Sequence, residues 1–114
     1  MIEEEFIARN FAISEETVIG KYKFVIYDIS DWPKGAKMYN YCPGNMDVYY
    51  ENEFLFNSNT LIKMFLNQKN PKWKSDYFYD ISYFEDSIVK FNGNLFTWDF
   101  DMQTKRIVSR TINK

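Results

Sequence analysis

The sequence SIVKFNGNLFTWDFDMQTKRIVSRTI, residues 87–112, contains the clearest β-sheet pattern in the chain. Asn92-Gly93 is typical of a two-residue β-hairpin turn, because both central positions of a type I′ turn need positive φ. This turn would place Val89 opposite Phe96 and Ser87 opposite Trp98. The alternation then puts six apolar residues on one face: Val89, Phe91, Phe96, Trp98, Phe100 and Met102. A further turn near Gln103-Thr104 predicts a three-stranded meander over 87–92, 95–102 and 105–112.

Two stretches further upstream also have the composition of strands. Residues 17–29 are apolar on both parities near their end, which predicts a central strand covered on both faces. Residues 46–56 predict a second long strand, with Met46, Val48, Tyr50, Phe54 and Phe56 on one parity. Before Ser14 the pattern is ambiguous, because it alternates like a strand but begins with Glu3–Glu5, which suits the start of a helix.

One segment has helical periodicity instead. Ser58 is a suitable N-cap, Pro71 marks an end, and a stripe of four apolar residues follows the cap: Leu61, Ile62, Phe65 and Leu66. The helix is expected at about 59–69, with its stripe in the core. The sequence therefore predicts one α+β domain over residues 1–114. It would contain a curved, mainly antiparallel sheet of about five to seven strands with this helix on one face, and it leaves a second, N-terminal helix open.

The composition argues against most kinds of catalytic site. The 114 residues include no histidine and one cysteine, Cys42, in the turn-like context Tyr41-Cys42-Pro43-Gly44. These two residue types supply most metal ligands, neutral-pH acid–base groups and activated nucleophiles. The four glycines stand alone, so neither nucleotide-binding fingerprint is present. We therefore expect no enzymatic activity, no cofactor and no metal.

Charge and hydropathy indicate the compartment and the kind of partner. The chain has 16 acidic and 14 basic residues, a net charge of −2, which argues against binding nucleic acid through its phosphates. The basic residues at the C-terminal end are interpreted as a solvated strand edge that discourages pairing: Lys105, Arg106, Arg110 and Lys114. An acidic N-terminus and no long apolar stretch predict a cytoplasmic protein that is not bound to a membrane.

Two segments combine acidic and aromatic residues, and they carry the functional prediction. Residues 76–86 contain four acidic and no basic residues among several aromatic ones, and residues 47–53 add three acidic residues and two tyrosines. Tyrosine supplies rigid contact area, and carboxylates attract basic partners over long range. The candidate partner-binding residues are Asp76, Tyr79, Asp80, Tyr83, Glu85, Asp86, Glu51 and Glu53. The competing interpretation is that the tyrosines pack on a sheet while the acids only keep it solvated.

The leading functional hypothesis is a non-catalytic binding protein that covers the active site of a basic partner. One concrete form is an inhibitor of the immunity or antitoxin type, directed against a nuclease-like toxin. Acidic side chains would occupy the place of nucleic-acid phosphates, and tyrosines would anchor the contact. A homodimer is left open, because an exposed aromatic face can pair with its own copy.

Two hypotheses from other classes remain. The first is a small-molecule site between sheet and helix, with Tyr27, Trp32 and Tyr41 at its mouth. The second is a metal-dependent hydrolase that uses Asp99 and Asp101, whose carboxylates lie about 7 Å apart on one face of a strand, from a rise of roughly 3.3 Å per residue. Against the second, these two acids are also what a solvated strand face carries, with Lys105 or Arg106 neutralising Asp101.

Overall fold

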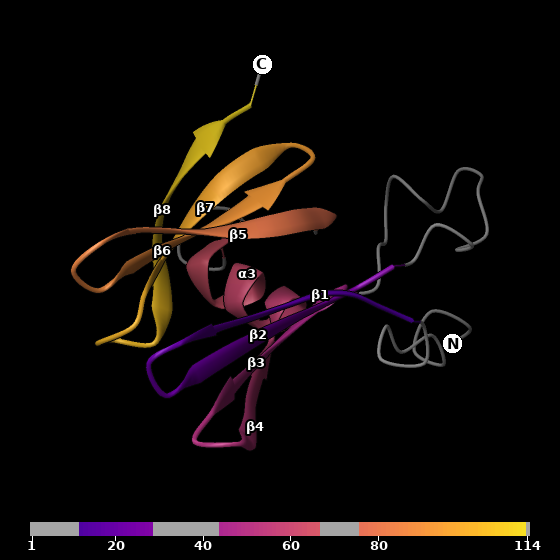
Figure 1. Cartoon of the computed structure of the whole chain (residues 1–114). Coiled ribbons are helices and arrows are strands. Elements are labelled where there is room, and N and C mark those ends of the chain that lie inside the picture. The colour runs from indigo at the N-terminus through magenta and orange to yellow at the C-terminus, as the bar shows by residue number, and fades with distance from the viewer. Residues whose placement is uncertain (1–11, 29–43, 67–75, 114) are drawn as a thin grey trace.

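Eight strands and one helix make up the described part of the computed structural model, residues 12–28, 44–66 and 76–113 (Figure 1). In chain order they are β1 (Ile13–Ile19), β2 (Tyr22–Tyr27), β3 (Met46–Tyr50), β4 (Glu53–Asn57), α3 (Ser58–Leu66), β5 (Phe78–Glu85), β6 (Ile88–Gly93), β7 (Phe96–Asp101) and β8 (Arg106–Ile112). The ambiguous N-terminal segment, and with it the second helix that the sequence left open, lies outside the described residues.

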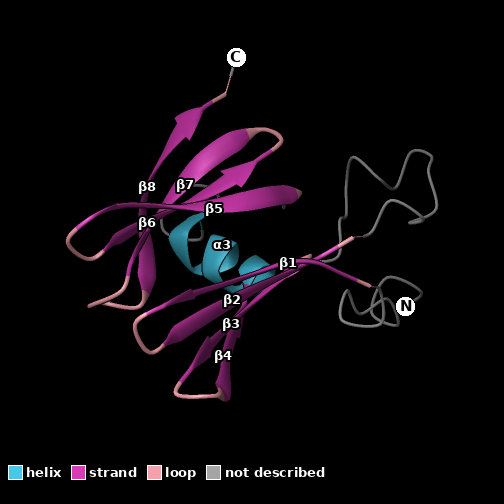
Figure 2. Ribbon diagram, viewed as in Figure 1, coloured by secondary structure: helices cyan, strands magenta, loops and turns pink. Residues whose placement is uncertain are grey.

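The strands form two antiparallel sheets. Sheet A has the order β1-β2-β3-β4 and sheet B has the order β5-β6-β7-β8, so each is a simple meander. Helix α3 connects the two and lies between them (Figure 2), against β3 and β4 on one side and β8 on the other. The fold is broadly α+β, and neither sheet closes into a barrel within the described residues. The prediction of one sheet with five to seven strands was wrong, because two of the predicted long strands are hairpins.

The first of these hairpins replaces the predicted strand 17–29. Gly20 has a φ of +59° and begins a two-residue turn, so that Ile19 pairs with Tyr22. The turn changes which residues face the core: an unbroken strand would put Val18 on the same face as Phe24, but Val18 is 66% exposed. Only β2 behaves as predicted: from Phe24 to Tyr27 it is buried on both faces.

The second hairpin replaces the predicted strand 46–56. Glu51 and Asn52 have φ values of +52° and +71°, the pair of positive values that a type I′ turn requires. Tyr50 therefore pairs with Glu53. A bulge between Val48 and Tyr49 shifts the register, and Phe54 on the returning strand is exposed rather than in the core.

The C-terminal meander is present as predicted, but its first turn lies two residues later. Val89 pairs with Phe100 and Phe91 with Trp98, so the turn residues are Asn94 and Leu95. The carboxylate of Asp76 stabilises the turn at this position, because it accepts hydrogen bonds from the backbone amides of Leu95 and Phe96 at 2.9 and 3.0 Å. Because the register changes by an even number of residues, the predicted apolar face is preserved and forms the core of sheet B.

Helix α3 packs its apolar stripe into the core, as predicted. Leu61, Ile62 and Leu66 are buried, and the ring of Phe65 meets Trp98 edge to face. The N-cap is one residue earlier than predicted, since the side chain of Asn57 accepts the backbone amide of Asn59 at 3.0 Å. At nine residues, the helix of the described region is too short to cross a bilayer.

Aromatic packing and a buried amide join the two sheets. Phe24 of sheet A contacts Phe91 and Phe100 of sheet B, with ring centroids 5.6 and 6.0 Å apart. The side chain of Asn45 accepts the backbone N–H of Phe78 at 2.9 Å and donates to the carbonyls of Phe78 and Tyr27 at 2.9 and 3.2 Å. This amide joins the first residue of β5 to sheet A, and β5 also lies close to β1 and β2.

Candidate partner-binding surface

The acidic, aromatic segment 76–86 begins inside the protein. Asp76 is 3% exposed, and its carboxylate accepts four hydrogen bonds. Three come from the backbone amides of Tyr77, Leu95 and Phe96, and the fourth comes from the indole Nε1 of Trp98 at 2.9 Å. A carboxylate with this many internal donors is part of the fold's framework, so we do not place Asp76 on the binding surface.

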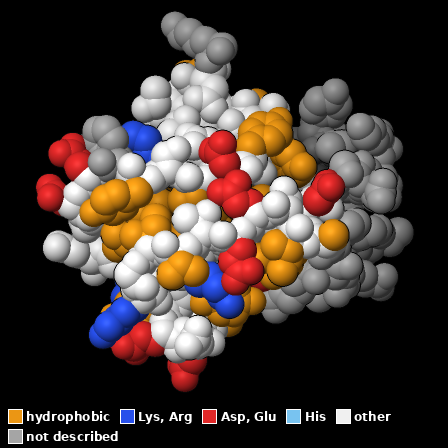
Figure 3. Space-filling view, viewed as in Figure 1, with side chains coloured by type: hydrophobic (Ala, Val, Ile, Leu, Met, Phe, Trp, Pro, Cys, Tyr) orange, Lys and Arg blue, Asp and Glu red, His pale blue; other side chains and the backbone are white. Residues whose placement is uncertain are grey.

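Five later tyrosine and acidic side chains of the segment are exposed. Tyr79 and Tyr83 are 52% and 54% exposed, and Asp80, Glu85 and Asp86 are exposed beside them. Figure 3 shows acidic side chains next to hydrophobic ones, tyrosine included, over β5 on the viewed face. β5 is also an end strand, hydrogen-bonded to one neighbour in its sheet. We call this group of side chains the β5 surface: Tyr79, Asp80, Tyr83, Glu85 and Asp86.

Hydrogen bonds orient the side chains of the β5 surface. The hydroxyl of Tyr79 donates to the side chain of Asn94 at 3.0 Å, and that of Tyr83 donates to the carbonyl of Asp86. Asn92 on β6 donates its side-chain amide to the carboxylate of Asp80. Rings that are already held in place lose less conformational entropy when a partner covers them.

Glu51 and Glu53 belong to a different surface. Glu51 is in the β3–β4 turn and forms an ion pair with Lys21 at 3.1 Å, and Glu53 begins β4. The hydrogen bond and the charge of Glu51 raise the pKa of Lys21. Both glutamates are on sheet A, whereas the β5 surface is on sheet B, so the structure divides the predicted set into two groups (Figure 1).

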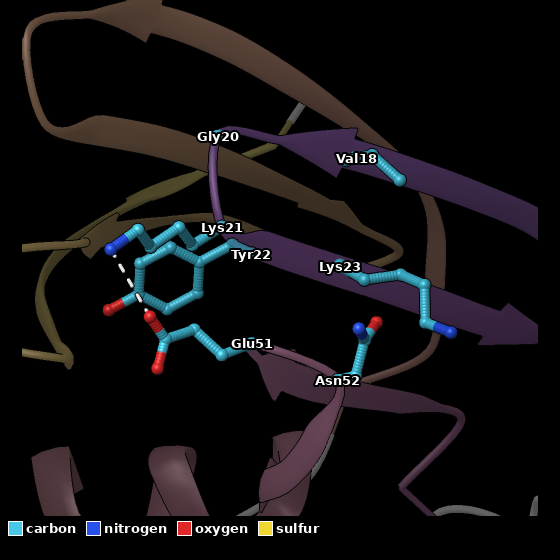
Figure 4. A pocket seen from close by; sticks show the side chains of 7 residues that line it. All are labelled: Val18, Gly20, Lys21, Tyr22, Lys23, Glu51 and Asn52. Carbon is cyan, nitrogen blue, oxygen red and sulfur yellow. Dashed lines mark ion pairs between the residues drawn. The ribbon is translucent and has the colours of Figure 1, made fainter.

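An open hollow of about 400 Å³ lies beside Glu51, between the β1–β2 and β3–β4 turns (Figure 4). Most of the residues that line it have polar or charged side chains: Val18, Gly20, Lys21, Tyr22, Lys23, Glu51 and Asn52. The Lys21–Glu51 ion pair runs along one side of it. This hollow is at the end of sheet A, and it differs in place and chemistry from the aromatic pocket expected between sheet and helix.

The three residues expected at the mouth of that aromatic pocket do not support the hypothesis of a small-molecule site. Tyr27 is buried, and its hydroxyl donates to the carboxylate of Asp47 at 3.2 Å. Burial, and then the charge of Asp47, raises the pKa of Tyr27 above its ordinary value. Trp32 and Tyr41 lie outside the described residues, as does Cys42.

Asp99 and Asp101 have separate partners. Asp99 accepts hydrogen bonds from Lys90 Nζ at 2.8 Å and from the hydroxyl of Ser109 at 2.6 Å. Asp101 accepts from the backbone amide of Gln103 and the hydroxyl of Ser87, and these bonds lower its pKa. Within the described residues, no three carboxylate or thiol side chains gather as a metal site would require. The ion pair at this site joins Lys90 to Asp99. The sequence had instead predicted that Lys105 or Arg106 would neutralise Asp101.

Sequence reasoning did not identify the residues that hold the β5 surface in place. Asn92 was interpreted only as a turn residue and Asn94 was not considered, yet their side chains bind Asp80 and Tyr79. The register that brings Asp80 opposite Asn92 depends on β5 being the neighbour of β6. No local signal in the sequence carries that information.

Comparison with protein-family models, with curated proteins and with solved structures finds no match to this chain. The functional inference therefore rests on the chemistry and exposure of the residues described above.

Proposed function

We propose that this chain is a non-catalytic binding protein that docks a basic protein partner on the β5 surface. Its concrete form is an inhibitor of the immunity or antitoxin type that covers the active site of a nuclease-like toxin. The observation that carries the proposal is the placement of two oriented, half-exposed tyrosines among exposed carboxylates on an end strand.

The tyrosines would supply most of the binding free energy. Tyr79 and Tyr83 have large apolar areas in contact with water, and aromatic side chains of this kind dominate protein interfaces when a partner covers them. Tyr77 supports Tyr79 from the side, with ring centroids 5.0 Å apart and planes at 84°. A partner would thus meet an aromatic platform that is already packed.

The carboxylates would govern the approach and the choice of partner. Asp80, Glu85 and Asp86 are exposed and lie within seven positions of one another on β5 and the turn that follows it. Such a group attracts a basic cleft over long range and stands where nucleic-acid phosphates would otherwise bind. Occlusion by this surface requires no chemical step.

A capture experiment with matched charge reversals tests the proposal. The immobilised chain is expected to retain a basic protein from its native cell extract. Asp80→Lys with Glu85→Lys is expected to abolish that retention. Glu51→Lys with Glu53→Lys changes the net charge equally but lies on sheet A, so it is expected to leave retention intact. Equal retention by both double variants would contradict the proposal.

A further inference from the structure

The two end strands of sheet B carry opposite charges. β5 presents the acidic β5 surface, and β8, at the other edge, is exposed at every residue except Ile107. From this complementarity we propose that the chain associates head to tail, with β8 of one copy docking along β5 of a second copy. The inference does not depend on the proposed function, because it requires no other partner.

The β8 surface combines cations with exposed apolar side chains: Arg106, Val108, Arg110 and Ile112. Val108 and Ile112 are 48% and 65% exposed. The guanidinium of Arg110 lies 4.1 Å from the ring centre of Phe96 and 5.4 Å from that of Trp98. Stacking occupies the flat face of a guanidinium, whereas its N–H donors lie in the plane, so the stacked Arg110 can still bind a carboxylate.

The two edges also match in length and in apolar content. β5 has eight residues and β8 has seven. Of the eight large hydrophobic side chains exposed in the described region, four are on these two strands: Tyr79, Tyr83, Val108 and Ile112. Docking edge to edge would extend the sheet of one copy by the four strands of the next, with backbone hydrogen bonds across the junction.

The charges specify the direction of association. Two β5 edges would bring carboxylates together and two β8 edges would bring arginines together, and both arrangements repel. The favourable contact is heterologous, so the copies either close into a ring or extend as a chain. A second copy on β5 would cover the β5 surface, and self-association would compete with a basic partner.

The test is sedimentation velocity on the full chain at rising concentration and low salt. The mass is expected to rise from the 13.8 kDa of one chain by at least about twofold, as a heterologous interface requires, and to fall again at high salt. A wild-type mass that stays at 13.8 kDa up to millimolar concentration would overturn the inference.

Charge-swapped variants make the test specific. Asp80→Lys with Glu85→Lys, and separately Arg106→Glu with Arg110→Glu, are each expected to stay single. An equimolar mixture is expected to associate, because a β5–β8 contact between the two different variants again joins opposite charges. A mixture that stays single contradicts the inference. If loss of the Arg110 stacking prevents folding, Arg106→Glu with Thr111→Glu replaces the second variant. This β8 variant leaves the β5 surface intact, so capture of a basic partner tests the proposed function separately.

Discussion

The two ends of the segment 76–86 share a composition but have opposite environments. Asp76 is buried and accepts four hydrogen bonds, whereas Asp80 and Glu85 are exposed to solvent. Asn45 holds Phe78 between these two ends, and Phe78 is 1% exposed. The change from buried to exposed residues therefore falls within β5. An acidic side chain before Phe78 stabilises the fold, and one after it is available to a partner.

Removing the buried acid should have the largest effect. Asp76→Ala leaves four N–H donors without their acceptor and is expected to lower the free energy of unfolding by about 3 kcal/mol or more. Urea unfolding measures this value. Asp80→Ala is the matched control from the exposed end, and its cost should stay within about 0.5 kcal/mol. A similar loss of unfolding free energy in the two variants would contradict the division of this segment into a buried and an exposed end.

The next largest effect should come from the boundary. Asn45→Ala removes both side-chain hydrogen bonds to Phe78 and is expected to cost about 2 kcal/mol. Hydrogen exchange by NMR should show faster exchange of the Phe78 amide, which Asn45 accepts. Unchanged protection of that amide would mean that β5 is held against sheet A by packing alone.

On the exposed side, a tyrosine should affect binding and leave stability almost unchanged. Tyr83→Ala is expected to weaken binding to the captured basic partner by roughly tenfold, because it removes a half-exposed ring that the partner would bury. Isothermal titration calorimetry gives the affinity, and urea unfolding checks the fold. A Tyr83→Ala variant with wild-type affinity would remove the ring from the interface.

Asp101 should show the smallest effect, because it is a half-buried acid with hydrogen bonds of its own. The backbone amide of Gln103 and the hydroxyl of Ser87 hold its pKa below the ordinary 3.8. A lowered folded-state pKa stabilises the protein above pH 3.8, and this contribution is lost as pH falls through the folded-state value. Asp101→Asn should remove that part of the pH dependence and cost less than about 1 kcal/mol. Urea unfolding between neutral and acidic pH measures this pH dependence of the free energy of unfolding. A variant with the same pH dependence as the wild-type chain would show that Asp101 does not contribute to it.

The sequence predicts the parts of the fold that depend on local pattern. Alternation from Val89 to Phe100 predicts the core face of sheet B, and the stripe from Leu61 to Leu66 predicts the helix. Hairpin turns inside continuous apolar patterns are not predicted. The turn at Glu51-Asn52 has two positive φ values, and a glutamate gives no signal for one of them.

The candidate surface was predictable only in part. The sequence placed Tyr79 and Tyr83 among the candidates, and the structure leaves both half exposed. It also included Asp76, whose main donors are 19 to 22 positions further along the chain. Long-range hydrogen bonds of this kind depend on strand order, which composition does not encode.

We propose that the exposed end of β5 recognises a basic protein through its carboxylates and tyrosines. The most direct test is the association rate constant of the captured partner, measured by surface plasmon resonance over a range of salt concentrations. The rate constant is expected to fall by about tenfold or more as salt rises. Asp80→Lys with Glu85→Lys should remove this salt dependence, whereas Glu51→Lys with Glu53→Lys should retain it. An association rate that does not depend on salt in the wild-type chain would contradict this proposal.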